Sequence, residues 1–559
     1  MNSQIINTHY LTCFQVNALK EKKMKNYFLL FLVALSFSAI QAQPPGFEWI
    51  KKYGTPLQDA VHAISEDSEG NIYLAAGFSD TITLESETLI SNGGTDALLI
   101  KCNSNGDILW FTSIGGTADD MGTEVTIDPE GNVIFSGVFH SHEVFIGDTI
   151  LYSCGCWEFS FTSKYSSTGE LQWVHSVLGE GAVITNGQAV NSEGDIYVTG
   201  VFYMQSYFGS DTVVTAGSAD IFLAMYSQSG ILQWVKTFGY SGYDYGADIT
   251  LDNNEMPVLT GYFEKKVTFG NDTLASSGYY DTYIVKTDAD GNPLWAKKAG
   301  GENEDQGIGI CVDAQNKIYI TGFYSGTTWF EDYSFESVGN YDSYLARYDE
   351  NGYFENAVVF GGTDHEMGTK VSVDQTGNIY ACGQFSGSVT FADTLLTSTN
   401  YLDSYLIKLD SDWNRVWIKQ AGGLNQQKIT DIAVTGNDSL YICITFSDSV
   451  FIDGDTIPGY GGGWDDFMVG RILPDSLLTQ TMLFTNEDFL IYPNPVTDRL
   501  QLVTNSESFV RIIETSGRTI YTRRFESTHT IDCSGFEKGI YFVEVTTRKS
   551  KKISKIVKY

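Results

Sequence analysis

A tryptophan returns along this 559-residue chain at an almost constant interval. Successive members of the series are 61, 63, 61, 61 and 122 residues apart, and Asn356 stands at the midpoint of the double interval. Such a period indicates an array of one repeated structural unit, because a single unit cannot bury its apolar faces without neighbours. The tryptophans are Trp49, Trp110, Trp173, Trp234, Trp295 and Trp417.

Two further markers share this period and define seven units. The first is a glycine that follows a strand-like run: Gly77, Gly137, Gly200, Gly261, Gly322 and Gly383. The second is an aspartate that opens a later run: Asp96, Asp220, Asp281, Asp342, Asp403 and Asp466. Each unit holds four runs with period-2 alternation, such as GADITLD, PVLTGYF, TYIVKTD and LWAKKAG, separated by turns rich in Gly, Asn and Asp.

Four antiparallel strands repeated seven times predict an all-β fold, a seven-bladed β-propeller over residues 43–480. The segment FEWIKKYG (47–54) precedes the first complete unit, so we expect it to close the ring by completing the last blade. The segment LLTQTMLF (477–484) competes for that place. An open solenoid is the alternative, although seven units without a distinct capping repeat favour a ring.

The pattern GNIYLAAGF…TDALLIKCNSNGDILWFTSIGGTADDMG (70–122) resembles the bacterial SBBP-type β-propeller repeat. The resemblance covers roughly residues 47–480 and implies a propeller, but it implies no particular activity. Units three and seven depart from the pattern, with Met225 at the lysine position of unit three and Ile444 in place of the strand glycine of unit seven.

The chain changes character after a linker at residues 481–490. Residues 490–559 carry 12 Lys and Arg against 7 Asp and Glu, and IYPNPVTDRLQL (491–502) is a rigid entry into a strand. Several short strands in this segment predict a small immunoglobulin-like β-sandwich over 491–559, with the basic tail KKISKIVKY (551–559) as an edge strand.

This segment resembles the type A C-terminal sorting domain of the type IX secretion system of Bacteroidetes. The resemblance implies that the protein engages the type IX secretion machinery and reaches the cell surface or the extracellular space. An ordinary immunoglobulin-like module is the alternative. The matching residues are Tyr492, Pro493, Asn494, Pro495, Gly517, Gly539, Tyr541, Lys555 and Lys558.

The N-terminal residues 1–42 are interpreted as an extension and a signal peptide. Three lysines precede the apolar run 27–40, and a cleavage site follows between Ala42 and Gln43. We expect translation to start at Met24 and the mature protein to contain no transmembrane segment. The net charge of −35 argues against a nucleic-acid partner, because an acidic surface repels phosphate groups.

One acidic position recurs ten residues after the marker tryptophan. It precedes the strand expected to lie innermost, so these carboxylates are candidates for a cation or cationic-ligand site at one mouth of the channel, with calcium as the candidate ion. The alternative is that each carboxylate accepts N–H groups of its own loop. No other cofactor is expected. The residues are Asp59, Asp120, Asp244, Asp305 and Glu366.

Aromatic residues beside the aspartate marker are candidates for stacking on sugar rings, with packing inside the blades as the alternative. They are Tyr280, Tyr341, Tyr401 and Trp464. His140 and His142 form an H-x-H pair, and Cys154 and Cys156 form a C-x-C pair. Each is half of a metal site at most, and neither predicts a metal centre by itself, because the sequence shows no third ligand.

No catalytic motif is present, so we expect no catalytic residues and a binding or adhesion protein whose ligand is a glycan or a protein. An extracellular polysaccharide hydrolase or lyase is the first alternative, since carboxylates near the channel are the groups such enzymes use. A structural surface protein is the second alternative.

Overall fold

The computed structural model describes residues 44–391, 394–435, 439–461, 463–473, 489–492, 499–504, 507–514, 518–525, 528–547 and 551–558. The described residues form strands and no helix, which confirms the all-β prediction. No helix among them is long and apolar enough to cross a membrane. The signal-peptide residues, Met24, Ala42 and Gln43 lie outside the described residues, as does the segment 477–484.

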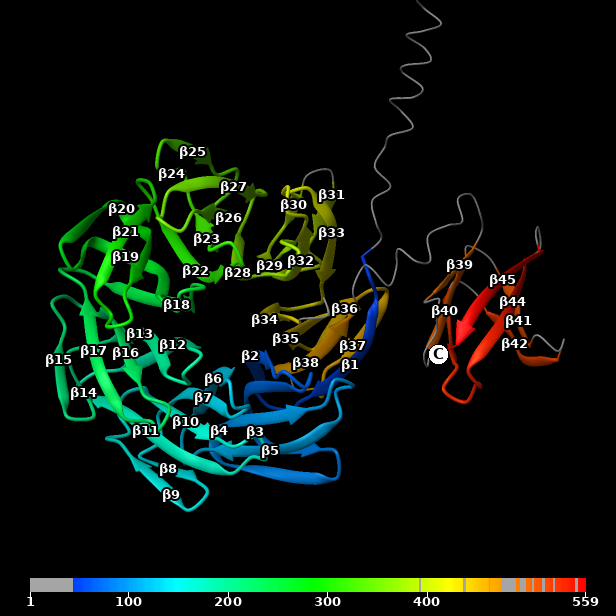
Figure 1. The fold of residues 1–559 in the computed structure, drawn as a ribbon, viewed down its shortest axis with the longest axis horizontal. Helices are drawn as coiled ribbons and strands as arrows, with labels where there is room; N and C mark the ends of the chain where they lie inside the picture. Colours follow the sequence, from blue (N-terminus) through cyan, green and yellow to red (C-terminus); the bar gives the residue numbers. More distant parts are fainter. Residues whose placement is uncertain are drawn as a thin grey trace, which may run out of the picture. The chain divides into compact units, whose positions relative to one another are not determined.

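Residues 47–472 form seven four-stranded antiparallel units, called sheets 1 to 7 here in chain order (Figure 1). In sheets 2 and 4 a hairpin of the following unit pairs with the fourth strand and extends the sheet to six strands. Sheet 1 consists of β2 (Ala60–Glu66), β3 (Ile72–Leu84), β4 (Glu87–Cys102) and β5 (Ile108–Ile114). Sheet 2 consists of β6 (Asp120–Ile127), β7 (Val133–Phe139), β10 (Phe159–Tyr165) and β11 (Leu171–Gly179). Sheet 3 consists of β12 (Val183–Val190), β13 (Ile196–Phe202), β16 (Asp220–Tyr226) and β17 (Leu232–Phe238). Sheet 4 consists of β18 (Asp244–Leu251), β19 (Pro257–Phe269), β20 (Asp272–Thr287) and β21 (Pro293–Ala299).

The remaining three sheets repeat this order. Sheet 5 consists of β22 (Asp305–Val312), β23 (Ile318–Tyr324), β26 (Asp342–Tyr348) and β27 (Phe354–Phe360). Sheet 6 consists of β28 (Glu366–Val373), β29 (Ile379–Phe385), β32 (Asp403–Leu409) and β33 (Arg415–Ala421). Sheet 7 is β34 (Gln427–Val434), β35 (Leu440–Ser447), β38 (Asp465–Ile472) and β1 (Phe47–Tyr53). The pairing of β1 with β38 confirms that FEWIKKYG completes the last sheet.

The first strands of consecutive sheets contact one another from β2 to β34, and β34 in turn contacts β2. The amide of Ile64 in β2, for example, donates to Asp431 Oδ2 in β34 at 2.9 Å, although 367 residues separate them. Apolar clusters lie between neighbouring sheets, as where Tyr73 of sheet 1 and Phe135 of sheet 2 share one core. The core is therefore distributed over the interfaces between sheets, as expected for a repeat whose units cannot fold alone.

A hairpin projects between the second and third strands of most sheets and contacts the preceding sheet, as in the bridges Gly115–Phe145 and Gly422–Phe451. In sheets 1 and 4 the hairpin continues the long strands β3–β4 and β19–β20. The separate hairpins are β8 (Glu143–Ile146) with β9 (Thr149–Tyr152), β14 (Gln205–Phe208) with β15 (Asp211–Val214), β24 (Thr327–Phe330) with β25 (Tyr333–Glu336), β30 (Ser388–Phe391) with β31 (Thr394–Thr397), and β36 (Ser449–Ile452) with β37 (Asp455–Pro458).

The marker tryptophans explain the period of 61 residues. Each tryptophan lies on the fourth strand of its sheet, and the five from Trp49 to Trp295 cover the turn between the third and fourth strands of the next sheet. Trp417 has no such turn to cover, because sheet 7 takes its fourth strand from β1. The indole N–H of Trp49 donates to the carbonyl of Ser104 at 3.0 Å, and a Cβ on Gly106 would lie 2.9 Å from the Trp49 ring. The turn glycine, whose φ is 78°, therefore serves both the left-handed conformation and the close approach of the indole.

At the interface between sheets 5 and 6, the indole comes from the second sheet rather than the first. Asn356 replaces its tryptophan, and Trp413 replaces the turn glycine of sheet 6. The Trp413 ring stacks on Tyr319 of sheet 5 with centroids 6.2 Å apart, and the Arg347 guanidinium lies 5.5 Å above the indole. The indole thus comes from the neighbouring sheet, although its φ of 68° is unfavourable for a side chain with a Cβ.

The repeated lysine and the aspartate of the first turn form a buried ion pair. Lys164 Nζ lies 2.7 Å from Asp128 Oδ2, and both side chains are almost completely buried. Burial alone would raise the pKa of Asp128, but Lys164 and Asn132 outweigh it and hold the pKa below its usual range. In sheet 3, Asn191 and Met225 replace both members, so no charge is left without a partner.

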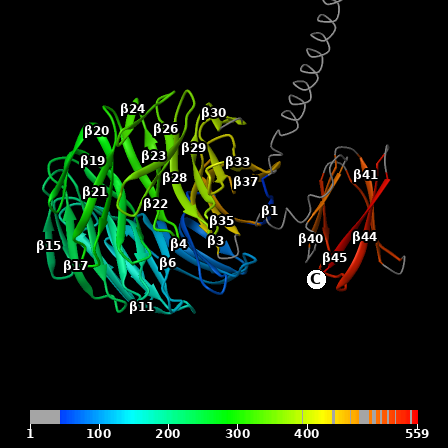
Figure 2. The ribbon, with the colours of Figure 1, turned by 45° about the horizontal axis from the view of Figure 1, so that its top comes forward.

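The C-terminal segment forms two antiparallel sheets around one apolar core that includes Leu500, Val510, Tyr541 and Val543. One sheet is β39 (Phe489–Tyr492), β40 (Arg499–Thr504) and β43 (Thr528–Asp532), and the other is β42 (Thr519–Phe525), β41 (Ser508–Glu514), β44 (Gly539–Thr547) and β45 (Lys551–Lys558). The basic tail is an edge strand along β44, as predicted (Figure 2).

Removing the indole of Trp413 tests whether it replaces the missing tryptophan at the interface between sheets 5 and 6. Trp413→Gly should lower the free energy of unfolding by about 2 kcal/mol, since most of a large aromatic contact is lost. The double variant Asn356→Trp with Trp413→Gly should recover most of this loss, because it restores the arrangement of the other interfaces. Urea denaturation measures both, and a double variant no more stable than Trp413→Gly would contradict the interpretation.

Removing the cation of the buried Lys164–Asp128 ion pair tests how much this repeated contact stabilises the fold. Lys164→Met should destabilise the protein by about 3–5 kcal/mol, because Asp128 is left as a buried charge without its cation. Adding Asp128→Asn should restore most of the stability, since this pair copies Met225 and Asn191. Thermal unfolding at pH 7 compares the three proteins. The stabilisation exists above the ordinary carboxyl pKa and is lost as the pH falls, so the double variant should be less acid-sensitive than the wild type.

Candidate functional site

The five repeated carboxylates lie at the edge of the sheets where the first strands begin, which we call the rim. All are buried. Asp120 accepts the amide of Gly116 at 2.8 Å and the hydroxyl of Ser141 at 2.7 Å. The same bond to the residue four positions earlier recurs as Thr55–Asp59 at 2.5 Å, Tyr240–Asp244 at 3.2 Å, Gly301–Asp305 at 2.8 Å and Gly362–Glu366 at 2.7 Å. Each carboxylate closes the loop that leads into its own strand.

Each of these carboxylates also faces the marker aspartate of the preceding sheet, 24 positions earlier in the chain or, for Asp59, across the closure to Asp466. Burial, reinforced by Asp220, raises the pKa of Asp244 to about 8, and burial with Asp281 raises that of Asp305 to about 7. One oxygen of each of these four side chains lacks a hydrogen-bond partner among the described residues. The pair of Asp220 and Asp244 therefore holds a proton at neutral pH.

The cation-site hypothesis stays a prediction. The structure divides the five carboxylates among five separate loops, and the part of the chain that it describes holds no group of three or more His, Cys, Asp or Glu side chains arranged for a metal ion. At the one interface where both acids are replaced, the two positions hold Phe159 and Val183.

A second charged cluster lies inside the space enclosed by the first strands. Every first strand is bulged. The residue after the bulge is, from sheet 1 to sheet 7, Ala63, Glu124, Gly187, Asp248, Gly309, Lys370 and Asp431. Lys370 Nζ at this position reaches Asp248 Oδ2 at 3.1 Å, two sheets away. The acidic neighbours hold the pKa of Lys370 above its usual range, while burial raises the pKa of Glu124 to about 8. Our alignment of the repeats followed positions that keep the same residue, so it missed this cluster. A search for the position at which the residue type varies between charged and uncharged would have found it.

A cavity of about 200 Å³ lies where the first and last sheets meet. His62, Lys428 and Asp465 are among its lining residues. Burial and the nearby Lys428 ammonium lower the pKa of His62 to about 4, so the imidazole is neutral at pH 7. This volume is below the usual range of ligand pockets, about 300–1,000 Å³, so it is a secondary candidate.

Tyrosines gather at the rim of sheets 3 and 4. The rings of Tyr245 and Tyr262 stack with centroids 4.9 Å apart, because the two residues are opposite each other on β18 and β19. Tyr280 packs edge-on against Tyr262 at 5.2 Å, and Tyr279 packs edge-on against Tyr280 at 5.4 Å. We call this set the tyrosine surface: Tyr203, Tyr243, Tyr245, Tyr262, Tyr279 and Tyr280.

Polar groups border the tyrosine surface. Glu304 pairs with the backbone of Tyr280 and accepts the hydroxyl of Tyr341 at 2.7 Å and the side-chain amide of Gln306 at 2.7 Å. The hydroxyls of Tyr203 and Tyr243 are 2.9 Å apart. Tyr279 leaves 67% of its surface exposed. The surface thus combines a fixed aromatic layer with an exposed ring and oriented hydrogen-bonding groups.

The predicted aromatic residues separate into two groups. Tyr280 and Tyr341 lie half-buried around Glu304, whereas Tyr401 and Trp464 are exposed on other sheets. Sequence reasoning missed Tyr203, Tyr243, Tyr245 and Tyr262, which occupy unrelated register positions. The density of tyrosine in YSGYDYG, GYF and GYYD was the available signal.

The other predicted residues are placed as follows. Tyr492 ends β39, Gly539 opens β44, and Tyr541 is buried there. Lys555 and Lys558 lie in β45, while Pro493, Asn494, Pro495 and Gly517 lie outside the described residues. His142 lies against Gly155, the residue between Cys154 and Cys156.

Comparison with known families assigns the C-terminal segment. Residues 490–559 match the family described as "Secretion system C-terminal sorting domain". This confirms the predicted sorting domain and the engagement of the type IX machinery. The protein is exported by type IX secretion to the cell surface or the extracellular space.

Two curated proteins are similar to this chain. The chain is 22% identical over 538 residues to the Uncharacterized WD repeat-containing protein L264 of Acanthamoeba polyphaga mimivirus, covering 76% of this chain and 39% of that protein. It is 27% identical over 221 residues to the Regulatory protein FlaEY of Caulobacter vibrioides, covering 37% of this chain and 23% of that protein. The chain thus spans well under half the length of either relative.

Two solved structures are also similar. The extracellular domain of BT4673 from B. thetaiotaomicron is 9% identical, with 92% of this chain and 100% of that chain covered and a TM-score of 0.14. The Synechocystis apocarotenoid oxygenase is 10% identical, with 67% and 93% covered and a TM-score of 0.31. At these TM-scores neither structure establishes a shared fold.

The buried carboxyl pairs predict a stability that falls as the pH rises. A carboxyl whose pKa is raised by folding binds its proton more tightly in the folded state, so its stabilisation is full below pH 4 and declines up to about pH 8. Asp244→Asn should therefore stabilise the protein by about 1 kcal/mol or more at pH 9 and little at pH 4. Gln427 is the natural precedent for an amide at this position.

Melting temperatures between pH 4 and pH 9 measure the effect, with the exposed Asp148→Asn as the control. A uniform loss of stability in Asp244→Asn at every pH would show that the carboxyl holds no extra proton.

Proposed function

We propose that this protein is a secreted seven-bladed β-propeller of the SBBP type, followed by an immunoglobulin-like sorting domain, which binds a glycan without turning it over. The observation that carries the binding proposal is the tyrosine surface. It is confined to two neighbouring sheets, as expected for a ligand site on an otherwise repeated scaffold.

The cyclic contacts support the ring architecture. Consecutive first strands touch in order, β34 touches β2, and the N-terminal β1 supplies the fourth strand of the last sheet. An open solenoid would leave sheets 1 and 7 without each other as neighbours. The carboxyl pair of Asp466 and Asp59 also spans this closure, as such pairs span four of the other interfaces.

The chemistry of the tyrosine surface favours a sugar over a flat protein partner. A pyranose ring presents apolar C–H groups that pack on an aromatic face, and its hydroxyls need oriented donors and acceptors. Tyr279 offers the exposed ring, while Glu304 and Gln306 offer polar groups already held in place. Burial raises the pKa of Tyr243 and Tyr262, so their phenols stay protonated.

Charge narrows the ligand class. The chain has a net charge of −35, and Glu304 and Glu264 lie beside the tyrosines. Sulfated or uronic-acid polymers would be repelled, so neutral or amino-sugar glycans are the expected ligands.

An extracellular hydrolase or lyase remains the rival function. A glycosidase needs two carboxyl groups about 5–10 Å apart across a cleft, one of them able to exchange a proton. Glu304 instead accepts bonds from Tyr341 and Gln306 on its two oxygens, an arrangement suited to a fixed acceptor.

A glycan array with the full-length secreted protein tests binding. Tyr279→Ala should weaken binding of the best glycan about tenfold, since loss of one aromatic contact costs roughly 1–2 kcal/mol. Tyr401→Ala is the matched control, because Tyr401 occupies the same register position two residues before the marker aspartate and is 62% exposed.

Binding that Tyr279→Ala leaves intact, or that Tyr401→Ala abolishes, would place the site elsewhere. Release of reducing ends from the bound glycan would replace the binding function with the enzymatic one.

A further inference from the structure

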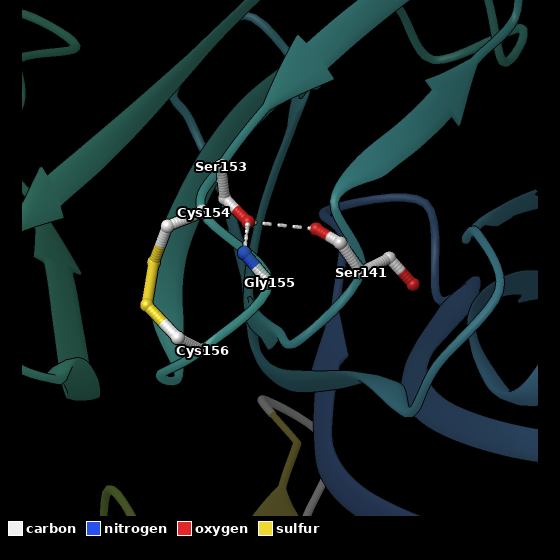
Figure 3. The surroundings of a disulfide bond; sticks show 5 residues. All are labelled: Ser141, Ser153, Cys154, Gly155 and Cys156. Carbon is white, nitrogen blue, oxygen red and sulfur yellow. Dashed lines mark hydrogen bonds between the residues drawn. A yellow bond between two sulfur atoms is a disulfide. The ribbon is translucent and has the colours of Figure 1, made fainter.

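Two short motifs, 14 positions apart in the sequence, meet at the base of the hairpin β8–β9. The amide of Ser153 donates to the carbonyl of His142 at 2.9 Å, and the Ser153 hydroxyl donates to the carbonyl of Ser141 at 2.9 Å (Figure 3). A Cβ built on Gly155 would lie 3.4 Å from His142 Cβ. The H-x-H pair and the C-x-C pair are therefore neighbours in space.

The four potential ligands of this loop are accessible. Ser141 is buried and bonded to Asp120, so the flanking His140 and His142 face away from the core. His142, Cys154 and Cys156 are exposed. His140 also approaches the second segment, since its Nε2 lies 3.6 Å from Glu158 Oε1, two residues beyond Cys156.

The two cysteines are joined as a disulfide between residues two positions apart. A ring this small removes less freedom from the unfolded chain than a long loop does, so the bond is a weak structural cross-link. Exposed disulfides are also the ones that thiols reduce most readily. In the disulfide form the sulfurs are occupied, and the described residues present no group of three or more metal-binding side chains.

We propose that this loop is a redox-gated site for a thiophilic dication such as Zn²⁺. A dithiol reductant transfers two electrons and two protons to the Cys154–Cys156 bond, which breaks to two thiols while the reductant becomes its own disulfide. The cation then displaces the two thiol protons and is bound by both thiolates together with the imidazoles of His142 and His140. Two sulfur and two nitrogen ligands match the tetrahedral preference of zinc.

The other thiols of the repeats do not compete for the ion. Cys102, Cys382 and Cys443 are buried, and Cys311 on β22 is half-buried, where desolvation raises the pKa of its thiol well above the ordinary value. Burial raises the pKa of the thiols of Cys102 and Cys382 to about 12, and it raises that of Cys443 well above the ordinary value. A reductant under native conditions therefore exposes one ligand set in this part of the chain.

Cobalt titration of the full-length protein tests the site, because Co²⁺ reports thiolate ligands and tetrahedral geometry by its absorption. The protein reduced with a phosphine should bind one Co²⁺ with a thiolate charge-transfer band that Zn²⁺ removes, and the oxidised protein should show no band. The double variant Cys154→Ser with Cys156→Ser should lose the band. His142→Ala should weaken binding at least tenfold, whereas the exposed His365→Ala on sheet 6 should match the wild type.

Three results would overturn the proposal. They are the absence of a thiolate band in the reduced protein, the same band in the double serine variant, and unchanged affinity when His140 and His142 are both replaced by alanine. Unchanged melting temperatures of the metal-free variants will show that the loop changes leave the fold intact.

Discussion

The contact between neighbouring sheets is the interaction on which the rest of this structure depends. Most interfaces repeat an indole over a turn glycine, a pair of buried acids and an apolar cluster, as with Trp49 over Gly106. No sheet buries both faces alone, so stability arises between units. The same kind of contact joins sheet 7 to sheet 1, where β34 contacts β2.

The residues that differ from the repeat pattern support the importance of these contacts, because both partners of a contact are replaced together. Trp413 stands opposite Asn356, and Met225 accompanies Asn191. A buried lysine without its carboxylate, or an empty indole site, would cost more than the coordinated exchange of both partners. The physical unit under constraint is therefore the contact rather than the single residue.

Repeated residues and functional candidates occupy different positions. Asp120 and its counterparts are buried, and each accepts a backbone amide of the loop that leads into its own strand. The tyrosine surface, the Lys370 cluster and the loop of Cys154 each occur once. A scaffold that repeats its structural contacts leaves the remaining positions free to differ, and the candidate sites lie at those positions.

The sequence by itself determined the period, the all-β class, the seven units, the role of FEWIKKYG in the last sheet and the export signal at the C-terminus. These follow from local patterns: strand alternation, turn residues, and markers whose spacing is visible in one dimension. Only the tertiary structure decided what Asp120 faces, which tyrosines meet, and that His142 lies beside Gly155. Those relations depend on backbone groups and side chains from different strands and sheets, as in the contact of Tyr245 with Tyr262 or of Lys370 with Asp248 across 122 residues. Periodicity places a residue on a strand, but only packing determines its neighbours.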